Sequence, residues 1–192
     1  MLLKDITMAE FKRRLKKTKT LIVPYGTIEA HGAHLPLNTD TLIIEEALKL
    51  ASGRMNAFIA PAIGYGVCTS TGLHPGTVGI TPETLRRLTV DIVRDAYKKG
   101  LRNFMLVSGH GGGLHVSAIK EAAEGLIDEL KGIRIAAFSI YDVMGAELRE
   151  PVPGTRLPAG CGAPGGPRPR GRGRGEGHRQ RPLRGRVPAG AP

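Results

Sequence analysis

The sequence predicts an α/β fold of three layers (α/β/α), in which helices cover both faces of a mainly parallel sheet. Over residues 1–153, short apolar runs alternate with segments of helical periodicity, which is the pattern of successive strand-helix units. A hydrophobic content of 41% over 192 residues is enough for one buried core. Residues 154–192 consist largely of Gly, Pro and Arg, so we expect them to form a disordered tail that adds nothing to this core.

In the first part of the chain, capping residues and apolar runs define four elements. A T-x-x-E capping box predicts a helix over residues 7–17. The run TLIVP, residues 20–24, is predicted to be a strand, and AFIAP, residues 57–61, a second one. Between them, a helix is predicted to begin after Asp40 and to end before Gly53. The apolar residues spaced to bury one face of that helix are Leu42, Ile43, Ala47 and Leu50.

In the second part of the chain, a proline and a glycine delimit the clearest helix. Thr81 is the predicted N-cap, Pro82 occupies the first helical position, and the helix is expected to reach Lys99 and stop at Gly100. The remaining predicted elements are a strand at 103–108, a helix at 114–130, a strand at 133–138 and a short helix around 142–148.

The positive charge is concentrated at the end of the chain. The formal net charge is +11, but nine of the 28 basic residues and one of the 17 acidic residues lie in residues 154–192. This segment would suit an Arg/Gly tail that binds RNA, although such tails usually carry aromatic residues for stacking and this one has none. A GC-rich coding region read out of frame after Pro153 would also explain the composition, including the absence of lysine. We favour this frameshift, and nucleic acid is therefore not the expected partner.

No feature of the sequence suggests export or membrane insertion. No apolar run is long enough to cross a bilayer, and charge begins at Lys4, where a secretory signal requires an apolar segment. Cys68 and Cys161 form no disulfide framework and are compatible with a reducing compartment. The sequence thus predicts a cytoplasmic protein.

Polar and glycine-rich segments follow three of the predicted strands, at 24–40, 64–77 and 109–113. Because the carboxyl ends of parallel strands meet at one edge of a sheet, we expect these segments to form one site. The ligand-type residues that it would gather are Glu29, His31, Asp40 and His110. Two imidazoles and two carboxylates suit Zn²⁺, Mn²⁺ or Fe²⁺, and a shared carboxylate, for which we choose Asp40, is the usual bridge between two ions.

Each of these residues also has a purely structural interpretation. Asp40 has the position of a helix N-cap, His110 stands among glycines where a structural histidine is common, and Glu29 fits a solvated loop. Their convergence on one edge favours the metal site. His34 is assigned either to a hydrogen bond behind the ligands or to loop packing, and His74 to the mouth of the pocket.

The segment GHGGG, residues 109–113, does not indicate other familiar sites. An esterase oxyanion loop would require a G-x-S-x-G nucleophile motif, which is missing, and Leu114 replaces the last glycine of G-x-G-x-x-G. No G-x-x-x-x-G-K-[ST] phosphate loop is present. Gly112 and Gly113 instead offer close backbone approach, with amide hydrogens at a helix start that can face a substrate oxygen.

The motif PYGTIEAHGAHLPLNTD resembles that of the creatininase family of metal-dependent amidohydrolases. HPGT followed by TPETL, and VSGHGGG after a strand, extend the resemblance over residues 1 to about 150. It implies an α/β/α fold, a binuclear metal site, hydrolysis of a non-peptide carbon-nitrogen bond in a small amide, and a homohexamer. By motif position it implies that Glu29, His31, Asp40 and His110 are metal ligands, with Asp40 bridging. A formylamino-pyrimidine, deformylated in cofactor biosynthesis, is an alternative substrate.

The chain departs from the family pattern at several points. Ser108 and Gly113 replace two asparagines of the family, and Gly112 stands where creatininase has a carboxylate ligand. An H-A-G-E segment, which supplies a glutamate and a histidine in many members, is missing, and Glu176 and His178 do not replace it. We therefore expect residues 1–153 to be an incomplete family domain with impaired activity, and we assign no catalytic side chain.

Overall fold

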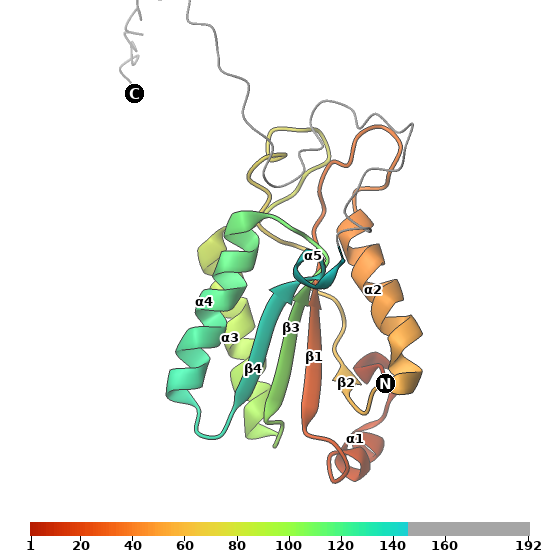
Figure 1. Cartoon of the computed structure of the whole chain (residues 1–192), viewed down its shortest axis with the longest axis vertical. Helices are drawn as coiled ribbons and strands as arrows, with labels where there is room; N and C mark the ends of the chain where they lie inside the picture. Colours follow the sequence, from red (N-terminus) through yellow and green to blue (C-terminus); the bar gives the residue numbers. More distant parts are fainter. Residues whose placement is uncertain (146–192) are drawn as a thin grey trace, which may run out of the picture.

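A four-stranded parallel sheet forms the centre of the molecule. The computed structural model describes residues 1–145; the predicted tail at 154–192, the end of the short helix predicted at 142–148 and any RNA-binding role of the tail lie outside the described residues. The strands are β1 (Thr20–Tyr25), β2 (Phe58–Ile59), β3 (Asn103–Ser108) and β4 (Arg134–Ser139), in the spatial order β2-β1-β3-β4 (Figure 1). All pairings are parallel, and Tyr25, Ser108 and Ser139 lie side by side at the carboxyl edge.

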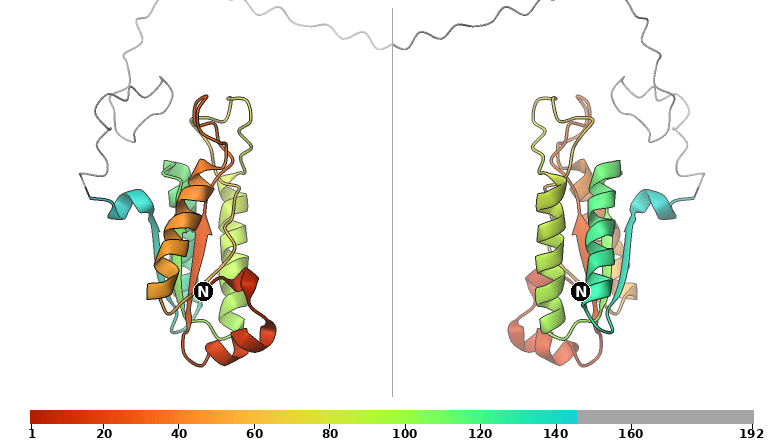
Figure 2. Two further views of the ribbon diagram at one scale, coloured as in Figure 1. Left: turned by 90° about the vertical axis from the view of Figure 1, so that its right-hand side faces the viewer. Right: turned by 90° about the vertical axis from the view of Figure 1, so that its left-hand side faces the viewer.

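Helices cover both faces of this sheet, which confirms the predicted three-layer α/β fold. The helices are α1 (Met8–Arg14), α2 (Thr39–Ala51), α3 (Pro82–Lys98), α4 (Gly113–Glu129) and α5 (Ile140–Val143), with 3-10 turns η1 (Leu3–Asp5) and η2 (Ser52–Arg54). Figure 2 shows α2 and α3 on opposite sides of β1. Helix α4 packs beside α3 and contributes to the same core.

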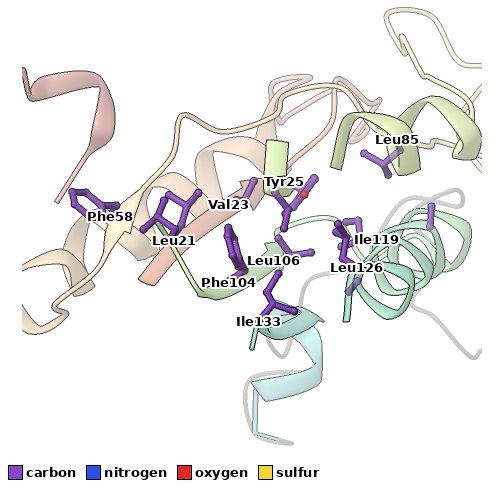
Figure 3. Packing of buried hydrophobic residues seen from close by; sticks show 14 of the residues in the cluster. Leu21, Val23, Tyr25, Phe58, Leu85, Phe104, Leu106, Ile119, Leu126 and Ile133 are labelled. Atoms are coloured by element: carbon purple, nitrogen blue, oxygen red, sulfur yellow. The ribbon is translucent and has the colours of Figure 1, made fainter. Parts of the chain in front are cut away.

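The two faces of β1 and β3 supply two separate cores because side chains alternate along a strand. Leu21, Val23 and Tyr25 point toward α3 and α4, where they meet Phe104 and Leu106 of β3 (Figure 3). The residues of the opposite face pack against α2 and form the smaller cluster Ile22, Ile44, Leu48, Ala57, Ile59 and Val107. The central strands are therefore buried on both sides.

Local signals placed most helix ends correctly. Thr7 and Glu10 form both hydrogen bonds of the capping box, although α1 ends at Arg14, before the predicted Lys17. The Thr81 hydroxyl accepts from the Thr84 N–H, and α3 ends just before Gly100, whose φ of +100° favours glycine. The strand predicted at 57–61 is reduced to two residues.

The predicted buried face of α2 is wrong. Leu42, Ile43, Ala47 and Leu50 are exposed, and the buried residues of this helix are Asp40, Ile44 and Leu48. These three are spaced four residues apart and share one helix face. The Asp40 side chain is drawn into the carboxyl edge of the sheet, and this sets the rotation of the whole helix.

None of the helices in residues 1–145 is long and apolar enough to cross a membrane.

Truncation of a side chain in the larger core should destabilise the fold. Leu106 is fully buried, so we expect Leu106→Ala to lower the free energy of unfolding by about 2–5 kcal/mol through lost burial and the cavity that remains. The matched control is Leu73→Ala, because Leu73 is fully exposed in a loop, and its effect should stay within about 0.5 kcal/mol. Denaturant unfolding of both variants measures this, and equal losses would contradict the described core.

Candidate metal centre

Two long loops stand together above the carboxyl edge of the sheet. Residues 26–38, after β1, and residues 64–80, after β2, lie side by side there (Figures 1 and 2). Ile28 and Val78 form an antiparallel bridge, and the Thr77 hydroxyl accepts from the Ala30 N–H at 2.9 Å. Thr77 of the HPGT segment, together with the Ile28–Val78 bridge, therefore holds the two loops together above the sheet.

Asp40 lies at the centre of this edge. It is in the first turn of α2 and only 3% exposed, and the N-cap of the helix is Asn38. The interpretation of Asp40 as a simple N-cap is therefore wrong. Its Oδ2 accepts from the Thr27 hydroxyl at 2.5 Å and lies 2.8 Å from His110 Nδ1, whereas Oδ1 lies 3.2 Å from His31 Nε2.

Backbone carbonyls fix the tautomers of both histidines. His31 Nδ1 lies 2.9 Å from the Glu29 carbonyl oxygen, and His110 Nε2 lies 3.2 Å from that of Val67. A carbonyl only accepts, so these nitrogens carry the hydrogens, and in a neutral ring the other nitrogen has a lone pair. Both remaining nitrogens face oxygens of Asp40. Lone pairs that face a carboxylate repel it unless a proton or a metal cation lies between them.

Glu29 adds a second buried carboxylate. It is 7% exposed, and its Oε2 lies 3.3 Å from His110 Nδ1, within ion-pair distance. In the described part of the chain this oxygen nevertheless has no partner in hydrogen-bond geometry, because Nδ1 is directed at Asp40. A buried carboxylate oxygen without a hydrogen-bond donor is unfavourable, and a cation or a further donor beside Glu29 would stabilise it.

The protonation energetics of the site reflect this crowding. Burial alone would lower the pKa of His110, but the hydrogen bond to Asp40 and the charge of Glu29 outweigh it and raise the pKa. Burial opposes ionisation of Asp40, yet hydrogen bonds from His110 and Thr27 hold its pKa below the usual value. The lowered pKa of Asp40 and the raised pKa of His110 therefore have a common cause, the hydrogen bond between these two side chains.

The other predicted site residues are two exposed histidines and two glycines at the start of α4. His34 and His74 are exposed on the two loops, and neither ring forms a hydrogen bond within residues 1–145. Gly112 is the N-cap of α4, and a Cβ there would lie 2.3 Å from His110 Nε2. Gly113 opens α4 with nothing within 4 Å of the corresponding position.

Comparison with known protein families identifies the group to which this geometry belongs. The family model described as creatininase, creatinine amidohydrolase, matches residues 4–156. The chain belongs to the creatininase family. The predicted resemblance is thereby confirmed over most of the chain.

The curated relatives of this creatininase-family chain are named for different activities. A mycofactocin precursor peptide peptidase of Mycobacterium tuberculosis is 34% identical in an alignment of length 113 that covers 54% of this chain and 44% of the relative. The creatinine amidohydrolase of Pseudomonas putida is 30% identical in an alignment of length 112 that covers 55% of this chain and 43% of the relative. A 3-dehydro-scyllo-inosose hydrolase of Thermotoga maritima is 28% identical, and the alignment covers 55% of this chain and 34% of the relative. The matched segments thus span less than half the length of these relatives.

Solved creatininase structures share the fold. The crystal structure of creatinine amidohydrolase superposes with a TM-score of 0.67 at 24% identity, over 77% of this chain and 61% of that chain. A creatininase mutant of Zn-Zn type gives a TM-score of 0.69 at the same identity and coverage. These matches agree with the predicted fold of this creatininase-family chain, a parallel sheet with helices on both faces.

Three residues at this centre were missed by the sequence reasoning. Thr27 binds Asp40, as described above. His115 is fully buried, and its Nδ1 accepts from the Val67 N–H at 3.1 Å; its position on the same helix face as Ala118, Ala122 and Leu126 was a signal that it points inward. Cys68 lies beside Glu29 and His110, and one donor atom from each of the three lies within 4.8 Å of the others. No local motif indicated Cys68.

The residue donors fit a metal ion. The set offers carboxylate oxygen, imidazole nitrogen and sulfur, all of which zinc accepts. A cation would provide a partner for Oε2 of Glu29, which has none among the described residues, and for the two nitrogens that face Asp40. Burial, and then the charge of Glu29, raise the pKa of the Cys68 thiol to about 12, so the ion-free protein keeps this thiol neutral.

A glycine at the end of β3 allows α2 to bring Asp40 into the site. A Cβ at Gly109 would lie 2.2 Å from the carbonyl oxygen of Asp40 and 3.2 Å from Ile44 Cβ. We expect Gly109→Ala to lower the free energy of unfolding by about 1–3 kcal/mol, because the backbone of α2 must move. Denaturant unfolding measures this.

The control is Gly125→Ala in the interior of α4, where nothing lies within 4 Å of the new methyl group. This change should raise the free energy of unfolding by about 0.5–1 kcal/mol, because alanine is the better helix former. If Gly109→Ala were as stable as Gly125→Ala, the close approach of α2 to β3 would be refuted.

Proposed function

We propose that this chain is a metal-dependent amidohydrolase that cleaves the carbon-nitrogen bond of a small amide or cyclic amide. The observation that carries the proposal is the pair of imidazole nitrogens, His31 Nε2 and His110 Nδ1, that face the two oxygens of the Asp40 carboxylate. A divalent cation satisfies these nitrogens and the carboxylate oxygens together, and it also supplies the partner that Glu29 Oε2 lacks in the described residues.

The proposed ligands of two divalent ions, Zn²⁺, Mn²⁺ or Fe²⁺, are Glu29, His31, Asp40 and His110. Asp40 is the proposed bridge because Oδ1 faces His31 and Oδ2 faces His110. Divalent ions bound there would polarise an amide carbonyl and activate water for attack. Thr27 holds one oxygen of Asp40, and the Glu29 carbonyl orients the ring of His31.

The first turn of α4 is the proposed contact for a substrate oxygen. The helix begins beside His110, and Gly112, its N-cap, offers no side chain to the first N–H groups. Such groups bind anions or polarised oxygens when they face a ligand. Gly113 leaves open space at this point, and His34 and His74 are proposed substrate contacts on the loops above it.

The proposed substrate class follows from the curated relatives. One is named a creatinine amidohydrolase, which supports a cyclic amide, and others are named peptide peptidases, which support a linear amide. A formylamino-pyrimidine is a third amide to assay.

We further propose that the protein forms a homo-oligomer. Leu42, Ile43 and Leu50 of α2 are exposed in the single chain, at 42%, 41% and 82%. An apolar face of this kind is typical of a subunit contact. It also explains why the apolar pattern of α2 failed to predict the core-facing side.

Removal of the central carboxylate charge should abolish metal binding and activity together. We expect Asp40→Asn to lose at least about 90% of bound zinc and of any amide hydrolysis, because an amide is a far weaker ligand than a carboxylate. Zinc content after equilibrium dialysis and turnover of creatinine, a dipeptide and a formamide measure the two losses. Turnover by the unsubstituted chain is expected to be weak but to require added metal.

The matched control is Asp91→Asn, because Asp91 is exposed on α3, away from the carboxyl edge. It should keep the zinc content of the unsubstituted chain. Equal zinc content in all three proteins would refute the metal centre, and metal-independent hydrolysis that survives Asp40→Asn would refute the amidohydrolase proposal.

A further inference from the structure

Cys68 reaches the proposed metal centre from a third segment of the chain. Glu29 lies in the loop after β1, Cys68 in the loop after β2 and His110 directly after β3. One donor atom from each lies within 4.8 Å of the others. The fold therefore assembles an oxygen, a sulfur and a nitrogen donor at one point of the carboxyl edge.

The residues before Cys68 hold it in place. The Val67 N–H donates to His115 Nδ1 at 3.1 Å, and the Val67 carbonyl accepts from His110 Nε2 at 3.2 Å. Gly66 packs against His115, since a Cβ at Gly66 would lie 2.5 Å from the His115 ring. The Gly66 carbonyl oxygen accepts from the Ile80 N–H at 2.8 Å. The position of Cys68 relative to His110 is thus set by a hydrogen bond of His110 itself.

A second, independent observation indicates a ligand at this point. Oε2 of Glu29 is buried and, in the part of the chain that the structure describes, has no hydrogen-bond partner. Glu29 as a whole is 7% exposed, so solvent does not replace the missing donor. The thiol of Cys68 donates weakly to the Gly66 carbonyl oxygen at 3.8 Å, and it also lies beside the Glu29 carboxylate.

We propose that Cys68 is a thiolate ligand of the ion that Glu29 and His110 hold. This inference rests on the proposed function, because it requires that a divalent ion binds at this edge. A tetrahedral zinc ion keeps its donors roughly 3.4–3.6 Å apart, as its bond lengths dictate. Glu29 Oε2 and His110 Nδ1 are 3.3 Å apart, close to this spacing, and the three donors lie within 4.8 Å of one another. The thiol proton passes to solvent as the metal-sulfur bond forms.

Sulfur in the ligand set determines which metal is preferred. Thiolate is a soft ligand that favours Zn²⁺ and Co²⁺, whereas Mn²⁺ and Mg²⁺ favour oxygen ligands. The chain should therefore select zinc over manganese, and the selectivity should depend on Cys68. If Cys68 were only a small apolar packing residue, its replacement by serine would leave this selectivity unchanged.

Cobalt(II) provides a direct optical test in the full chain. A cobalt-thiolate bond gives a charge-transfer band in the near ultraviolet, and bound cobalt gives visible d–d bands whatever its ligands. The chain has one other cysteine, Cys161, so Cys161→Ser is the matched control. We expect the near-ultraviolet band in the unsubstituted chain and in Cys161→Ser, and its loss in Cys68→Ser. Zinc affinity should fall at least about tenfold in Cys68→Ser, with manganese affinity changed less than about threefold.

The possible outcomes separate this inference from the proposed function. Visible bands without the near-ultraviolet band in the unsubstituted chain would overturn the role of Cys68 and leave the metal centre standing. Loss of the band in Cys161→Ser instead of Cys68→Ser would overturn it as well. Failure of the full chain to bind cobalt or zinc at all would overturn both proposals.

Alkylation gives a second readout that does not require Cys68→Ser to fold. In Cys161→Ser, Cys68 is the remaining thiol, and bound zinc should slow its reaction with iodoacetamide at least about tenfold relative to the chelator-treated protein. Equal alkylation rates with and without bound zinc would contradict a metal-sulfur bond.

Discussion

A buried carboxylate that faces two imidazoles determines how α2 packs on the sheet and how the site is built. Asp40 is 3% exposed, and an isolated carboxylate in that position would destabilise the fold by several kcal/mol. The Thr27 hydroxyl, His31 and His110 compensate for this, and its place in the first turn of α2 adds a favourable helix dipole. Because Asp40 points inward, Ile44 and Leu48 point inward as well and form the smaller core. The interactions of Asp40 in the site and the packing of α2 on the sheet therefore depend on the same rotation of this helix.

Close backbone approach permits this arrangement. Gly109 lets α2 pass over the end of β3, Gly112 leaves space for the ring of His110, and Gly66 leaves space for that of His115. In each case a Cβ would lie within 2.5 Å of the neighbouring group. The glycines of the carboxyl edge thus serve packing first, and the exposure of the first turn of α4 follows from the lack of a side chain at Gly112.

The fold and part of the site were predictable from the sequence because their signals are local. The Thr7 capping box, the Thr81-Pro82 helix start and Gly100 fixed helix ends, and parallel strand order placed Glu29, His31, Asp40 and His110 at one edge. The face of α2 was not predictable, because Asp40 overrides the apolar periodicity of Leu42, Ile43 and Leu50. Cys68 and Thr27 could not be found in this way, since their contacts depend on how two loops pack together.

We propose that divalent cations, not protons, lie between the imidazole nitrogens of His31 and His110 and the Asp40 carboxylate. A crystal of the full chain grown with zinc, measured at the zinc absorption edge, tests this directly through anomalous scattering. We expect two anomalous peaks, one on each side of Asp40 and about 3.5–4 Å apart, as in two-metal sites generally. A well-ordered carboxyl edge without an anomalous peak beside Asp40, in a crystal that contains zinc, would contradict the account.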